Sequence, residues 1–146
     1  MNRNPYLRAY MAGIAFPTAF LLIPFCLSQF ALHAPDIMQR ALMFPLALIP
    51  NAFGVWNMLF VKLQPHWRHP IGLHGAALPF FIAPLFFVIA VTKDFVSLES
   101  GALIYFHMIR IPYGYLAFAP FIAIAAYYLL WKYAVGYLNS VVELPR

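Results

Sequence analysis

Residues 69–92 read HPIGLHGAALPFFIAPLFFVIAVT, and they decide the fold because they contain no Asp, Glu, Lys or Arg. Three further stretches share this property, at 9–35, 41–61 and 111–131, so the four windows contain 27, 21, 24 and 21 residues in chain order. The hydrocarbon core of a bilayer is about 30 Å thick, and about 20 helical residues cross it. Each window is therefore long enough to span a membrane once.

Composition excludes the other broad classes of protein. Of the 146 residues, 64% are hydrophobic and 9% are charged, whereas a soluble domain carries about 25% charged residues. The apolar excess also argues against disorder, and the single cysteine, Cys26, excludes an intrachain disulfide. Backbone groups in lipid must be hydrogen-bonded internally, and the windows lack the alternation of barrel strands, so helices are expected.

We therefore predict an all-α integral membrane protein with a single domain over 1–146. The four transmembrane helices are expected at about 9–33, 41–62, 70–92 and 111–134. The apolar run of the first helix is longer than that of a cleaved signal peptide, which predicts a retained signal anchor.

Every window contains proline, and four prolines lie well inside the predicted helices. A helix-interior proline removes one backbone hydrogen bond, so the helices are predicted to be kinked there. The simpler alternative is that proline is merely more frequent in membrane helices than in soluble ones. The four positions are Pro24, Pro50, Pro84 and Pro120.

Basic residues predict the orientation in the membrane. If the N-terminus lies inside, six Lys and Arg residues flank the inner ends of the spans and three flank the outer ends. Cytoplasmic loops carry such an excess, so both termini are predicted to be cytoplasmic, in a multi-pass protein of a bacterial cytoplasmic membrane. Aromatic and basic side chains at the inner ends are expected to meet lipid headgroups. They are Lys62, Trp67, Arg68, Trp131 and Lys132.

The segment 98–110 precedes the fourth window and is predicted to be a short interfacial helix on the outer surface. The alternative is that the fourth span begins near Gly101 and bends at Pro112.

Few residues of the sequence could take part in coupled transport, catalysis or the binding of a metal or haem. The windows contain no ionisable carboxylate or ammonium group, which argues against coupled transport, and no hydroxyl lies in a motif beside a base, so no enzymatic activity is predicted. His66, His69 and His74 lack a completing carboxylate or thiol, so lipid phosphate is a better expected ligand for the loop histidines than a metal ion. A haem needs two histidines at one depth, which the predicted spans do not provide.

The remaining polar side chains leave two roles open. His74, Asn51 and His107 are candidate contacts for a lipophilic cofactor, since a chlorophyll-type pigment needs one axial ligand. The structural alternative for Asn51, without any ligand, is a hydrogen bond between helices. Four further residues are candidates for close helix packing, namely Gly54, Asn57, Gly72 and Gly75.

These features favour a non-catalytic accessory or structural subunit of a larger membrane complex, with the lipid bilayer and other membrane subunits as partners. The alternative is a protein that binds a lipophilic pigment, carotenoid or quinone, and the third hypothesis is a passive pore or lipid-handling protein. Nucleic acid is not an expected partner, because the net charge of +5 is spread over short membrane flanks.

Overall fold

The computed structural model describes residues 4–31, 36–66, 68–107 and 109–145. Its main helices are α1 (Pro5–Cys26), α2 (Asp36–Leu63), α3 (Ile71–Thr92) and α4 (Tyr113–Leu129). Two π-helical turns, η1 (Leu27–Ala31) and η2 (Leu130–Val135), prolong α1 and α4, and η2 leads into α5 (Gly136–Val141).

Four helical segments in the described part of the chain are long and apolar enough to cross a membrane. They are Pro5–Phe30, Met43–Leu63, Ile71–Thr92 and Tyr113–Val141. The prediction of a multi-pass, mostly helical membrane protein is confirmed at this level. The fourth segment is longer than predicted, because the helix continues through η2 and α5.

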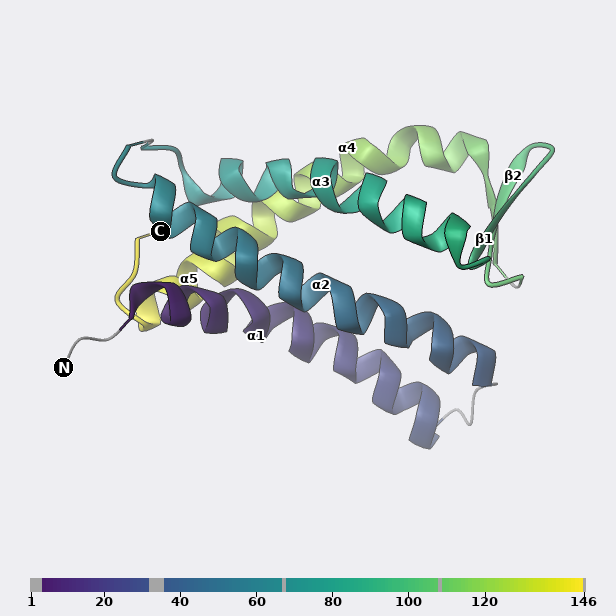
Figure 1. Ribbon diagram of the computed structural model, residues 1–146, viewed down its shortest axis with the longest axis horizontal. Coiled ribbons are helices and arrows are strands. Elements are labelled where there is room, and N and C mark those ends of the chain that lie inside the picture. Colours follow the sequence, from purple (N-terminus) through teal and green to yellow (C-terminus); the bar gives the residue numbers. More distant parts are fainter. Residues whose placement is uncertain (1–3, 32–35, 67, 108, 146) are drawn as a thin grey trace.

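The helices form two antiparallel pairs. Figure 1 shows α1 beside α2 and α3 beside α4, with the α2–α3 loop, the start of α1 and α5 gathered at one end of the molecule. Asn4 caps α1 through a hydrogen bond of 3.0 Å from the Tyr6 amide, and Pro5 occupies the first turn, where its missing N–H is tolerated. The interior prolines lie within continuous helices.

The predicted interfacial helix over 98–110 is wrong. The segment forms a three-stranded antiparallel sheet of β1 (Val96–Glu99), β2 (Ala102–Tyr105) and β3 (Ile109–Pro112), at the opposite end from the α2–α3 loop (Figure 1). Gly101 turns the chain between β1 and β2 with φ of 87°, a conformation that favours glycine. The alternative of an early fourth span is also wrong, because α4 begins at Tyr113.

The sheet has one apolar face and one face of mixed polarity. Alternate residues point to opposite faces and directly paired residues share a face. The register pairs Val96 with Tyr105 and Tyr105 with Ile109 on the apolar face, and Ser97, Ile104 and Arg110 on the other. A helix would spread these apolar residues over its whole circumference, whereas strands collect them on one side.

Candidate functional site

The two helix pairs are joined by an aromatic junction, which we define as Trp56, Phe60, His74 and Trp131. The indole N–H of Trp56 donates to the His74 carbonyl at 2.9 Å, and His74 Nε2 lies 3.1 Å from the Trp56 carbonyl. A carbonyl only accepts, so His74 carries its proton on Nε2 in this arrangement. The reciprocal pair ties α2 to α3.

Aromatic rings surround the imidazole of His74. The Trp56 ring stacks on it at a centroid distance of 4.8 Å, and the Phe60 and Trp131 rings lie at 5.3 and 5.9 Å. With the proton on Nε2, the lone pair of the neutral imidazole lies on Nδ1. The stacked and tilted rings around His74, with its bond to the Trp56 carbonyl, show that it packs between α2, α3 and the end of α4.

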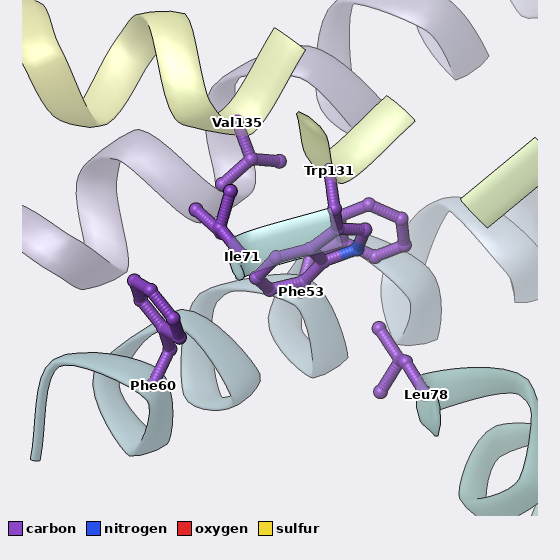
Figure 2. Close-up of a cluster of buried hydrophobic side chains, with 6 residues drawn as sticks. All are labelled: Phe53, Phe60, Ile71, Leu78, Trp131 and Val135. Carbon is purple, nitrogen blue, oxygen red and sulfur yellow. The ribbon is translucent and has the colours of Figure 1, made fainter. Parts of the chain in front are cut away.

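Gly75 lets the Trp131 indole enter the core. A Cβ atom at Gly75 would overlap the Trp131 side chain, and one at Gly72 would lie 2.9 Å from Tyr128 of α4. Trp131 is 0% exposed and belongs to the buried cluster drawn in Figure 2, with Phe53, Ile71 and Leu78 around it. The small residues near the start of α3 thus face the end of the fourth helical segment.

Trp131, predicted to meet lipid headgroups, is buried among other side chains. A belt tryptophan keeps its N–H at the wet interface, but the Trp131 indole nitrogen is buried without a hydrogen-bond partner in the described part of the chain. Lys62, Arg68 and Lys132 are exposed, and Trp67 lies outside the described residues. Contact of these residues with lipid headgroups stays a prediction. The Lys132 Nζ lies 5.3 Å from the centroid of the Tyr133 ring.

A pair of buried amides lies near the end of the bundle that carries the α2–α3 loop. Asn57 and Asn139 are both 0% exposed, and each donates to the other, at 2.7 and 3.1 Å. Asn57 also donates to the Ala9 carbonyl at 2.8 Å, and Asn139 donates to the Pro145 carbonyl at 3.0 Å. One polar cluster therefore connects α1, α2, α5 and the segment that follows α5.

Helices α1 and α2 cross closely at glycine. A Cβ at Gly13 would lie 2.6 Å from the Phe53 carbonyl oxygen, and one at Gly54 would lie 2.6 Å from the Tyr10 ring. One turn from this crossing, the Tyr10 hydroxyl donates to Asn51 Oδ1, and Asn51 Nδ2 donates to the Ala47 carbonyl at 2.7 Å. Asn51 nevertheless remains exposed on the surface of α2.

The three residues predicted to contact a cofactor do not come together. His74 lies at the aromatic junction, near the start of α3, and Asn51 lies on the exposed surface of α2. His107 is exposed in the sheet region, where its Nε2 is 3.8 Å from a carboxylate oxygen of Asp94. Among the residues that the structure describes, no three His, Cys, Asp or Glu side chains gather as a metal site would need.

An apolar cavity, here called the outer cavity, lies between α3, α4 and the apolar face of the sheet. Its volume is about 450 Å³. Burial raises the pKa of the Tyr105 hydroxyl above its ordinary value. The helices contribute Pro79, Ile82, Ala83, Phe86, Phe87, Ala90, Ala123 and Tyr127, and the sheet contributes Val96, Leu103, Tyr105 and Ile111.

Several participants in these contacts are not among the residues that the sequence predicts, and Asn139, Gly13 and Tyr10 are the polar and small ones. Asn139 lies beyond the fourth charge-free window, and Gly13 and Tyr10 fall in the first window without any charge or repeat beside them. A second Asn to match Asn57 was the available signal, because a buried amide needs a partner.

Comparisons of the chain with protein-family models, curated proteins and solved structures found no match.

Proposed function

We propose that this protein is a non-catalytic subunit of a larger membrane assembly and docks on other membrane helices through α2. The observation that carries the proposal is the exposure of Asn51. It lies two residues before Phe53, the middle residue of the span Met43–Leu63. An exposed amide at this depth meets hydrocarbon unless another helix covers it, and amides hydrogen-bond across membrane helices.

The side chains near Asn51 suit such a contact. Ala47, Asn51 and Val55 recur every four residues and are all exposed, with Val55 at 59%. Residues four apart share one face of a helix, and the small Ala47 allows a second backbone to approach. We define this exposed face, together with Met43, as the Asn51 stripe.

The test is purification of the tagged protein from native membranes in a mild detergent. We expect a partner in stoichiometric amount, and we expect Asn51→Leu to reduce its recovery. Thr92→Val is the matched control, because the Thr92 hydroxyl bonds, among the described residues, the Val88 and Ile89 carbonyls of its own helix. A protein that is purified as a monomer, with neither another protein nor a second copy bound, or a partner whose recovery is equal for both variants, contradicts the proposal.

The proposal includes an orientation with both termini in the cytoplasm. It is supported by the excess of Lys and Arg at the end that carries Arg8, Lys62 and Lys132. Kinks at the interior prolines belong to the same proposal, because each of these prolines leaves one carbonyl without its usual helix donor.

A second candidate function is the binding of a lipophilic tail, such as that of a quinone, carotenoid or lipid, in the outer cavity. Its volume of about 450 Å³ lies in the range of small-molecule sites, about 300–1,000 Å³. Mass spectrometry of an organic extract of the purified protein tests it. Ala83→Trp should fill the cavity and remove the bound compound, whereas Ala117→Trp on the exposed side of α4 should retain it.

A further inference from the structure

We propose that the partner covering the Asn51 stripe is a second copy of this chain. The inference rests on the proposed function, because it identifies the occupant of the same surface. Its starting point is the hydrogen-bonding capacity that remains on Asn51.

An amide side chain has two N–H donors and two acceptor lone pairs. In the described part of the chain, Asn51 uses one lone pair for the Tyr10 hydroxyl and one N–H for the Ala47 carbonyl. One donor and one acceptor therefore remain on the exposed side of α2. This remainder is self-complementary, because a second amide presents the acceptor and the donor that it lacks.

Membrane topology brings the two amides to the same depth. Copies of one chain insert with the same orientation, so a two-fold axis between them runs along the membrane normal. Residues near such an axis face their own counterparts at equal depth. Asn51 of one protomer would then meet Asn51 of its partner near the middle of the bilayer, where an amide pair has no competing water.

The protein already contains this type of contact. Asn57 and Asn139 exchange hydrogen bonds of 2.7 and 3.1 Å between α2 and α5, in a fully buried position. The same helix α2 therefore carries two Asn residues, one paired within the chain and one with an unused donor and acceptor. A second copy supplies the matching group without requiring any other protein.

Cysteine cross-linking in membranes tests which surface lies between the copies. Cys26→Ser removes the only native thiol, and single cysteines are then introduced by Ala47→Cys, Asn51→Cys and Val55→Cys. We expect disulfide-linked dimers at these positions and none for Phe118→Cys, an exposed position on α4. Disulfides require Cα atoms within about 7 Å, so dimers at Phe118 and not on the stripe would overturn the proposal.

Association is then measured with two differently tagged copies in lipid vesicles. Asn51→Leu should lower the association constant by about 3- to 30-fold, as expected for a lost hydrogen bond between membrane helices. Asn51→Gln should retain much of the association, because it keeps the amide. Tyr10→Phe separates the bond that Asn51 makes within its own chain from the bond proposed between copies. It removes the Tyr10 hydroxyl but leaves the Asn51 amide, so association should persist.

The outcomes distinguish this inference from the proposed function. If the tagged copies fail to associate while another protein cross-links to the stripe, the second copy is excluded and the subunit proposal stands. If neither a copy nor another protein cross-links to the stripe, both proposals fail. Equal loss of association in Tyr10→Phe and Asn51→Leu would assign Asn51 a role only within its own chain.

Discussion

At the scale of single residues, Gly75 is the position most sensitive to side-chain size. Adding a Cβ there overlaps Trp131, which is 0% exposed. We expect Gly75→Leu to lower the free energy of unfolding by at least about 1–3 kcal/mol, the usual cost of overfilling a packed core. Thermal unfolding in detergent measures the effect.

Two controls accompany this change. Gly114→Leu adds the same atoms where a Cβ meets nothing within 4 Å, and His66→Ala alters an exposed loop residue. Both should change stability by less than about 0.5–1 kcal/mol. A larger loss for His66→Ala than for Gly75→Leu would show that the loop histidines form a site, and the packing interpretation would be withdrawn.

The buried amides predict a measurable coupling. Asn139→Ala leaves Asn57 without two of its hydrogen bonds, so we expect a loss of about 1–3 kcal/mol in the free energy of unfolding. The double variant Asn57→Ala with Asn139→Ala should lose less than the sum of the single variants. Ser140→Ala, the exposed neighbour, is the control. Strictly additive losses would contradict a direct pair.

At the scale of elements, the small sheet depends on its apolar face. Leu103 lines the outer cavity, whereas Arg110 lies on the opposite face and is exposed. We expect Leu103→Lys to speed amide hydrogen exchange across β1, β2 and β3, because a charge would enter an apolar cavity. Arg110→Ala should leave exchange unchanged. The same exchange pattern in both variants would show that the apolar face does not hold the sheet in place.

The helices could be predicted from sequence because one physical requirement sets them. A window without charge that is long enough to cross lipid must form a helix, whatever its neighbours are. The sheet depends on weaker local signals: the Val-Ser-Leu-Glu and Ile-Arg-Ile-Pro runs alternate, but each is only four residues long. Trp131 is buried because Gly75, which is distant in the chain, leaves room for its indole. The residues next to Trp131 in the sequence do not reveal this contact, so they do not distinguish a tryptophan at the membrane boundary from one in the core.

At the scale of the whole molecule, the two terminal regions lie on the same side. A side-chain nitrogen of Arg8 is 3.4 Å from a Glu143 carboxylate oxygen, and an even number of spans requires this arrangement. With the inner excess of basic residues, we expect a C-terminal green fluorescent protein fusion to fluoresce and a C-terminal alkaline phosphatase fusion to be inactive. Active phosphatase would reverse the orientation.

The Asn57–Asn139 hydrogen bonds can form only late in the synthesis of the chain. The two residues are 82 positions apart, and at about 5–20 residues per second the ribosome needs about 4–16 s to make the second after the first. During that interval α1 and α2 have been synthesised, with Ala9 available as an acceptor for Asn57, while its side-chain oxygen still lacks the Asn139 donor. Completion of the fourth helical segment therefore marks the moment at which the Asn57 amide of a nascent chain gains its partner and is no longer offered to the insertion and quality-control machinery.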